Sequence, residues 1–239
     1  MMVTSTPAKT DVSARMETSG VMGWNPTVAD LTVAQGATGD QTDQAAKTHV
    51  IWVDDVLYTD KGKFKEVAGK EWGKLDMAAL GKRAGDAEGV RRALADMAGM
   101  GEDPARQLAL LLNAPSIEHV GSEDVGGGRA EHYKGSFTAE SVIKSTKKVA
   151  ALTPRERGRL LVDVERAGVD SYDFDVWVSG ADYPVKMNTW MKSPKGVITT
   201  SADFSDYGTK VAVEAPPAGD TVDMSEMLKE LRERELGLR

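Results

Sequence analysis

Alternating apolar and polar residues predict β-strands in the C-terminal half of the chain. In residues 172–191 (YDFDVWVSGADYPVKMNTWM), Phe174 and Val176 share one parity, whereas Asp173 and Asp175 lie on the other. A period of two places the apolar side chains on one face of a strand. The letters SGAD within this segment predict a turn. We therefore expect a hairpin that offers one apolar face.

A second hairpin is predicted in residues 48–60 (THVIWVDDVLYTD), where Asp54-Asp55 would form a tight turn between Val53 and Val56. Apolar residues fall on both of its faces, which is typical of a strand pair covered on both sides. Further strands are predicted at residues 2–6, 11–20, 27–34, 116–125, 129–138, 196–207 and 210–215, with a triple-glycine turn at 126–128.

Helices are predicted mainly in the middle of the chain, where the apolar spacing lengthens to that of a helical face. Asp103 is a candidate N-cap with Pro104 at the first helical position. Three further helices are predicted after Thr138, after a capping box that begins at Thr153, and after Asp223. Strands joined in hairpin order with few crossovers predict an antiparallel α+β fold, and a single domain over residues 1–239 is the simplest organisation.

Composition narrows the function classes. The chain has 239 residues, a formal charge of -7 and a sequence pI of about 5.1, so it lacks the basic stripe that a nucleic-acid groove needs. It has no cysteine, which excludes disulfides, thiol nucleophiles and zinc-thiolate sites. No apolar run reaches the ~18 residues of a transmembrane helix, and the start MMVTSTPAKT has no signal-peptide pattern.

Candidate catalytic or metal-binding residues are few. His119 and His132 flank the triple glycine, and they would share a face after a two-residue turn but point oppositely after a three-residue turn. A metal or hydrolytic site there remains an alternative, although exposed polar residues on strands are the commoner explanation. The chain has no G-x-S-x-G elbow, and the adjacent carboxylates of Asp54 and Asp55 usually just face water. We therefore expect no enzyme, no cofactor and no metal.

Methionine is the more informative residue type. The chain has 11 methionines against four phenylalanines. Methionine adapts to irregular apolar surfaces and suits a cavity that accepts variable chains, although simple core filling is more common.

Several segments resemble the predicted surface lipoproteins of actinobacteria that are related to the mycobacterial LppX/LprG group. The resemblance spans nearly the whole chain in the right order, and its motifs mark a fold and not a catalytic site. The segments are GVMGWNPTVADLTV (20–33), VIWVDDVLYTD (50–60), GKEWGKLD (69–76), DPARQLALLLNAPSIEHVG (103–121), AEHYKGSF (130–137), YDFDVWVSGADYPVKM (172–187) and FSDYGTKVAVEAPPA (204–218).

This resemblance implies a fold similar to that of the periplasmic lipoprotein carrier LolA. A strongly curved antiparallel sheet would form a half-barrel, helices would cover its concave face, and an apolar cavity would lie between them. It also implies a monomer on the extracytoplasmic side of the cell envelope, held at the membrane only through a lipid anchor. The leader, the lipobox cysteine and the first helix of that family are not found in this chain, because Met1 falls within the expected first strand.

The function expected from these features is non-enzymatic binding or carrying of a lipid or other apolar small molecule, with no nucleic-acid partner. The alternative is an envelope interaction or sensor module whose helices fill the core, leaving no ligand site. Candidate cavity residues of this kind are more often plain core than ligand contacts. These residues are Ile51, Val53, Leu108, Leu111, Val142, Val149, Phe174, Val176, Met187 and Met191.

Overall fold

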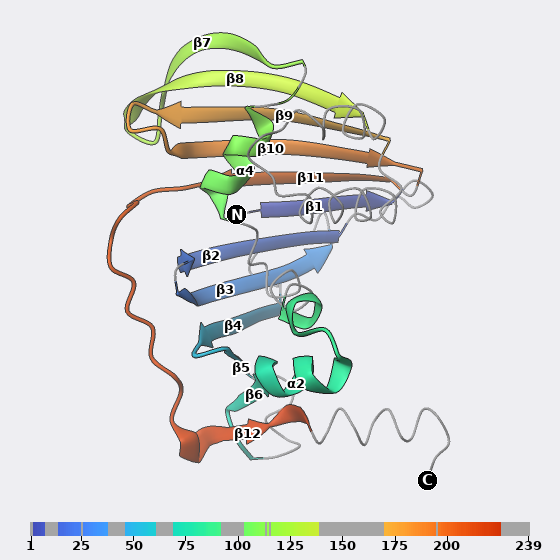
Figure 1. The fold of residues 1–239 in the computed structure, drawn as a ribbon, viewed down its shortest axis with the longest axis vertical. Coiled ribbons are helices and arrows are strands. Elements are labelled where there is room, and N and C mark those ends of the chain that lie inside the picture. Colours follow the sequence, from blue (N-terminus) through green and yellow to red (C-terminus); the bar gives the residue numbers. More distant parts are fainter. Residues whose placement is uncertain are drawn as a thin grey trace. The chain divides into compact units, whose positions relative to one another are not determined.

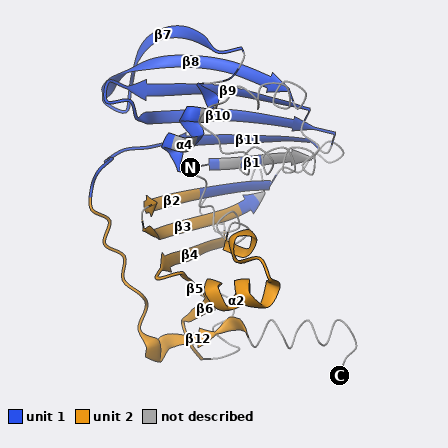
Figure 2. Cartoon of the chain, viewed as in Figure 1, with its two compact units in different colours: residues 1–17, 36–41, 102–209 blue, residues 18–35, 42–101, 210–239 orange. Residues whose placement is uncertain are grey.

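The computed structural model describes residues 2–7, 14–24, 26–37, 46–60, 69–91, 103–112, 114, 116–138, 170–194 and 196–225. Within these ranges the protein is mostly β, with a few short helices (Figure 1). The chain divides into two compact units, coloured separately in Figure 2. The single domain predicted for residues 1–239 stays a prediction, and each unit is described by itself.

Unit 1 comprises residues 1–17, 36–41 and 102–209 and contains an antiparallel sheet. Its strands follow the hydrogen-bonded order β2-β1-β11-β10-β9-β8-β7, with β2 contributing only its first residues. Among the described residues of this unit, α4 (Pro104–Leu111) is the one α-helix. The strands are β1 (Met2–Pro7), β2 (Ala14–Trp24), β7 (Glu118–Val125), β8 (Gly128–Thr138), β9 (Ser171–Ser179), β10 (Pro184–Ser193) and β11 (Gly196–Asp203).

Unit 2 comprises residues 18–35, 42–101 and 210–239 and contains a mixed sheet in the order β12-β6-β5-β4-β3-β2. The pairs β3–β4, β4–β5 and β5–β6 are antiparallel, whereas β12 pairs with β6 in parallel. Helix α2 (Met77–Ala84) begins where the Asp76 side chain accepts the Ala79 N–H and ends at Gly85. The remaining strands are β3 (Thr27–Ala37), β4 (Ala46–Val53), β5 (Val56–Asp60), β6 (Trp72–Asp76) and β12 (Thr221–Asp223).

The predicted hairpins are confirmed in register. Val53 pairs with Val56 across Asp54-Asp55, and both aspartates have positive φ (53° and 58°). Two consecutive turn residues with positive φ form a type I′ turn, whose twist matches that of the paired strands. The 172–191 hairpin is also confirmed, with Met187 opposite Val176.

The C-terminal strand prediction needs correction. Residues 210–215 form no strand, because this part of the connection after β11 makes no ladder with another strand among the described residues. The strand instead comes later, at β12, after the 3-10 turn η3 (Ala218–Asp220). The alternation of apolar and polar residues in KVAVEA was therefore not sufficient to predict a strand, because a strand also needs the edge of another strand with which to pair. The helices predicted after Thr138 and Thr153 lie outside the described residues.

Each unit has its own buried residues. In unit 2 the side chains of Leu31, Trp52 and Met77 are at most 2% exposed. In unit 1 the core is built on Phe174 and Val176 of β9, with Leu111 of α4. None of the helices in the described part of the chain has the length and apolar character needed to cross a membrane.

Candidate functional site

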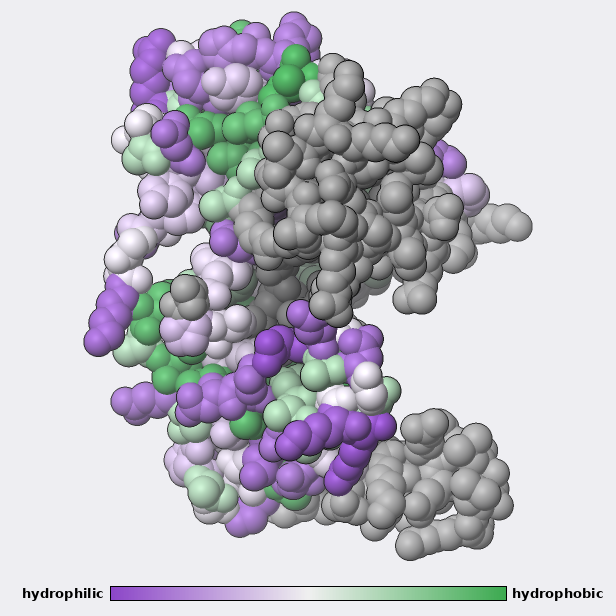
Figure 3. All heavy atoms as spheres, in the orientation of Figure 1, coloured by the Kyte–Doolittle hydropathy of each residue, from purple (hydrophilic) through white to green (hydrophobic). Residues whose placement is uncertain are grey.

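The sheet of unit 1 has one distinctly apolar face. On β9, Phe174 and Val176 share this face and are almost fully buried, at 2% and 0% exposure. Met187 of β10 lies opposite Val176, so the apolar face continues onto the next strand. Figure 3 shows strongly hydrophobic residues gathered on this side of unit 1, around α4. This face is the candidate site for an apolar ligand.

Helix α4 packs onto this face. Asp103 begins the helix, because its carboxylate accepts the N–H of Ala105 at 2.9 Å and its carbonyl accepts the N–H of Gln107. Leu108 and Leu111 then point into the sheet and are 5% and 2% exposed. The cap and Pro104 predicted from the sequence therefore position the two leucines over the sheet.

Aromatic side chains extend the apolar face toward one end of β8 and β9. The rings of Phe137 and Tyr172 stack with centroids 4.7 Å apart, and Phe174 lies 6.4 Å from Phe137. Phe137 and Tyr172 are only half-buried. Their remaining accessible surface is what an apolar ligand would bury.

The predicted lining residues separate into three groups. The structure places Leu108, Leu111, Phe174, Val176 and Met187 in one cluster in unit 1. Met191 has the same parity on β10 as Met187 and is half-buried. Ile51 and Val53 share a face of β4 in unit 2, and Val142 and Val149 lie outside the described residues.

Sequence reasoning missed several members of the apolar face. Partly buried aromatic residues pack against the core cluster from three segments, namely Tyr133, Phe137, Tyr172 and Phe204. The alternation within YKGSF of β8 was the available signal, since Tyr133 and Phe137 share a parity with Gly135 between them. Gly135 opposite Phe174 has no side chain, and the Phe174 ring occupies that space.

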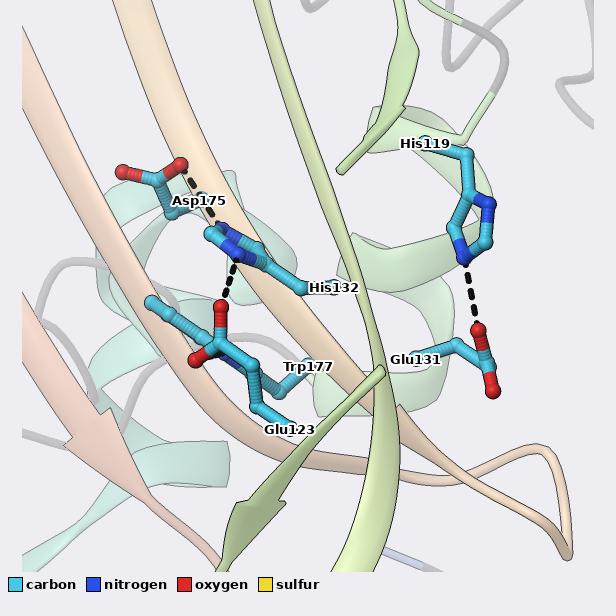
Figure 4. Close-up of polar contacts among 6 residues, drawn as sticks. All are labelled: His119, Glu123, Glu131, His132, Asp175 and Trp177. Carbon is cyan, nitrogen blue, oxygen red and sulfur yellow. Dashed lines mark hydrogen bonds and ion pairs between the residues drawn. The ribbon is translucent and has the colours of Figure 1, made fainter. Parts of the chain in front are cut away.

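The opposite face of the same sheet carries a polar cluster (Figure 4). His132 of β8 lies between two carboxylates: its Nδ1 is 2.8 Å from Glu123 Oε1, and its Nε2 is 3.0 Å from Asp175 Oδ1. Its ring stacks on Trp177 with centroids 4.2 Å apart. The Trp177 Nε1–H donates to Glu123 Oε2 at 3.0 Å, and this bond, followed by the one from His132, lowers the pKa of Glu123.

His119 belongs to the other face, although the turn has two residues. Val125 pairs with Gly128 across Gly126-Gly127, which on an unbroken ladder would put both histidines on one face. A β-bulge at Val120 shifts the register, so that His119 lies opposite Tyr133. The prediction of a shared face for a two-residue turn is therefore wrong, because the sequence gives no sign of the bulge.

The His119 contacts resemble a catalytic arrangement only superficially. Its Nε2 lies 2.6 Å from Glu131 Oε2, while the Ser122 hydroxyl donates to the other oxygen, Oε1, at 2.6 Å. The serine thus binds the carboxylate and not the imidazole, so it has no adjacent base to activate it. These two bonds, Ser122 first, lower the pKa of Glu131.

Two features of unit 2 account for its conspicuous polar residues. His49 Nε2 lies 2.7 Å from Asp30 Oδ1, and its ring meets Trp72 edge-on at 5.1 Å. The Asp55 carboxylate is bound by the Arg91 guanidinium at 2.8 Å, so this side chain of the turn has a counter-charge within the protein.

Comparison with known proteins gives two curated relatives from Streptomyces. The "Uncharacterized 31.2 kDa protein in rplA-rplJ intergenic region" of Streptomyces griseus is 30% identical over 226 residues, which is 90% of this chain and 71% of that protein. A protein of Streptomyces coelicolor named "Putative lipoprotein" is 27% identical over 225 residues, or 89% of this chain and 66% of that protein. No family model matches the chain.

Solved structures give weaker matches. The lipoprotein LppX of Mycobacterium tuberculosis aligns with a TM-score of 0.39 and 14% identity, over 89% of this chain and 88% of that one. LprF of Mycobacterium bovis aligns with a TM-score of 0.42 and 12% identity, over 90% and 88%. The Streptomyces matches cover most of the chain, as the resemblance to actinobacterial lipoproteins predicted, and the chain belongs to the same family as these Streptomyces proteins.

Proposed function

We propose that this protein binds a lipid or another apolar small molecule, without catalysing a reaction, on the extracytoplasmic side of the cell envelope. The observation that carries the proposal is the apolar face of unit 1, where half-buried aromatic residues adjoin a fully buried core. The proposed location is supported by the name of the Streptomyces coelicolor relative, which calls that protein a putative lipoprotein.

The energetics favour an apolar site of this kind for a lipid. Moving a 16-carbon acyl chain from a bilayer into water costs roughly 12 kcal/mol at ~0.8 kcal/mol per methylene. A carrier must recover most of this free energy by burying the chain against apolar side chains. Phe137, Tyr172 and Met191 retain accessible apolar surface that a ligand would cover. We further propose that the sheet is curved like a half-barrel, and that the helices covering its concave side leave a cavity there.

The proposed ligand contacts begin with the unit 1 residues predicted from sequence. Phe174, Val176 and Met187 would form the floor of the site, with Leu108 and Leu111 on one side. Met191, Phe137 and Tyr172 would contact the part of the ligand nearest the solvent. Ile51 and Val53, which lie in unit 2, and Val142 and Val149, which lie outside the described residues, stay predictions from sequence.

Native mass spectrometry of the purified full chain tests the proposal, supported by titration with a fluorescent fatty acid. Met191→Gln should weaken fatty-acid binding, because it places an amide on the apolar face. Trp190→Gln is the matched control, since Trp190 is the next residue on β10, is also half-buried, and lies on the opposite face. Binding in the control should be unchanged once circular dichroism shows that both variants are folded.

A second candidate, an interaction or sensor module with a filled core, is favoured by one observation. Leu108 and Leu111 of α4 already occupy part of the apolar face with their own side chains. Repeated ligand-free spectra, together with no fatty-acid binding by the wild-type protein, would overturn the lipid proposal in favour of this candidate.

A further inference from the structure

His132 connects two strands that do not pair with each other. Its Nδ1 contacts Glu123 of β7 and its Nε2 contacts Asp175 of β9, at 2.8 and 3.0 Å. β8, which carries His132, lies between β7 and β9 in the hydrogen-bonded order. Figure 4 shows the ring lying between the two carboxylates. The His132 side chain is only 12% exposed, so water does not easily replace either contact.

Both contacts require the charged form of the ring. An ionised carboxylate can only accept hydrogen bonds, and a neutral imidazole has a single N–H to donate. Only the imidazolium form donates from Nδ1 and Nε2 together. After loss of a proton, one carboxylate would face an imidazole lone pair, which repels it.

The other charged groups on this face define the electrostatic setting. Lys186 of β10 lies 5.5 Å from the centre of the Trp177 ring, and the indole lies next to His132. On β8, Lys134 is paired with Glu118 at 3.5 Å, and on β9, Asp173 is paired with Lys192 at 2.7 Å. Glu123 and Asp175 are thus the two carboxylates that face the imidazole directly.

We propose that His132 acts as a pH-dependent clasp, which in its protonated form fastens β7 to β9 across β8 and on losing its proton loosens β7. Within the described residues β7 is the last strand of the sheet and pairs only with β8. Its attachment therefore depends on a single ladder, which is interrupted by the bulge at Val120, and on side-chain contacts such as this one. The clasp does not depend on the proposed lipid binding.

Glu123 sets the acid limit of the clasp. Its hydrogen bonds from Trp177 and His132 hold its pKa below the ordinary glutamate value, so it stays ionised into mildly acidic solution. Histidines change charge between about pH 5 and 8. The clasp is therefore closed when the His132 ring is charged and Glu123 is ionised, and it opens when either condition is lost.

His119 provides an internal comparison on the opposite face of the same hairpin. It contacts a single carboxylate, Glu131, through Nε2 alone, and one N–H suffices for that bond in the neutral ring. His119 can therefore keep its contact after losing a proton, whereas His132 cannot keep both of its contacts. His119→Gln is accordingly the matched control for His132→Gln.

Hydrogen exchange of the β7 amides tests the clasp in the full chain. Protection factors for residues 118–125, corrected for the intrinsic pH dependence of exchange, should fall roughly 3- to 10-fold between about pH 6 and pH 8.5. The size of this fall is what the loss of a partly exposed, charge-assisted hydrogen bond would produce. The amides of β10 serve as the reference. His132→Gln should abolish this fall, whereas His119→Gln should retain it.

The protonation state supplies an independent readout in the wild-type protein. Nitrogen chemical shifts at about pH 6 should show both His132 ring nitrogens protonated. A neutral His132 ring at that pH would overturn the proposal. So would a fall in β7 protection of equal size in His132→Gln and in the wild type.

Discussion

The ring of Phe174 lies directly against the backbone of Gly135, its cross-strand partner. A Cβ atom on Gly135 would come within 2.5 Å of Phe174 Cζ and 2.9 Å of its Cε1. The missing side chain on β8 therefore allows the phenyl ring to fold down over the sheet. This is how Phe174 becomes almost fully buried on the proposed ligand-binding face.

Gly135→Ala should destabilise the protein, because the added methyl group displaces the Phe174 ring. We expect a loss of about 1–3 kcal/mol in the free energy of unfolding, measured by urea denaturation. Gly180→Ala is the control, since nothing lies within 4 Å of a Cβ at that position. Combining Gly135→Ala with Phe174→Leu should recover part of the loss, and an equal effect of the two glycine substitutions would contradict this account.

Leu111 and Leu112 are adjacent but should respond very differently to truncation. Leu111 is 2% exposed within the core cluster of unit 1, whereas Leu112 is 36% exposed. Leu111→Ala should cost about 2–5 kcal/mol in the free energy of unfolding. Leu112→Ala should stay within about 0.5 kcal/mol. Thermal or urea unfolding of both variants checks whether α4 packs through the predicted side.

Trp177→Phe should raise the pKa of Glu123 toward its ordinary value. The indole N–H is the largest cause of the lowered pKa, and phenylalanine keeps an aromatic ring for His132 to stack on but cannot donate. A carboxyl group whose pKa is lower in the folded than in the unfolded state stabilises the fold at pH values above its unfolded-state pKa. This contribution is lost as the pH falls below about 4.3. Unfolding of the variant should therefore depend less on pH in that acidic range.

The Glu123 prediction is checked by NMR titration of its carboxyl carbon. Trp190→Phe is the control, because Trp190 lies on the same face of the sheet but is not one of the groups that shift the pKa of Glu123. An unchanged Glu123 titration in Trp177→Phe would show that the indole N–H is not the cause.

Tyr207 should make the protein less stable in strongly alkaline solution. Burial, then the negative charge of Asp103, raise the pKa of the Tyr207 hydroxyl, which donates to the Pro184 carbonyl at 2.8 Å. Tyrosine in an unfolded chain loses its proton near pH ~10. Above that pH the unfolded state ionises first, so the free energy of unfolding falls as the pH rises.

Tyr207→Phe tests this expectation by urea unfolding at about pH 8 and pH 10.5, on either side of the ordinary tyrosine value. The variant should lose about 0.5–1.5 kcal/mol at the lower pH through the missing hydrogen bond. It should also show a smaller decrease between the two values than the wild type. Tyr58→Phe in unit 2 is the control, and an identical pH response in both variants would refute the assignment to Tyr207.

Much of the secondary structure could be predicted from local pattern alone. The alternation of Phe174 and Val176 with Asp173 and Asp175 predicts a strand with an apolar face, which the structure confirms. Asp103-Pro104 predicts the start of α4 at the observed residue. These features depend on chain geometry within a few residues, which the sequence specifies directly.

Other features could not be predicted because they depend on partners distant in the sequence. Residues 210–215 alternate like a strand, but strand β12 forms later and pairs in parallel with β6. The aromatic residues of β8 join the apolar face only because Tyr133 and Phe137 align with Val176 and Tyr172 of β9. This register pairs segments that lie about forty residues apart in the sequence. The local pattern of residues does not specify a pairing over such a distance.

The sequence by itself determined which strands have an apolar side, which loops turn tightly, and which side of α4 is apolar, because these follow from side-chain periodicity. Tertiary structure alone decided which of these surfaces meet and which polar groups come together. The bulge at Val120 places His119 and His132 on opposite faces, and the unbroken ladder between the bulge and the turn places Glu123 beside His132, which also contacts Asp175 of β9. One extra residue in a strand moves every following side chain to the other face of the sheet. The local sequence does not show where such a bulge forms.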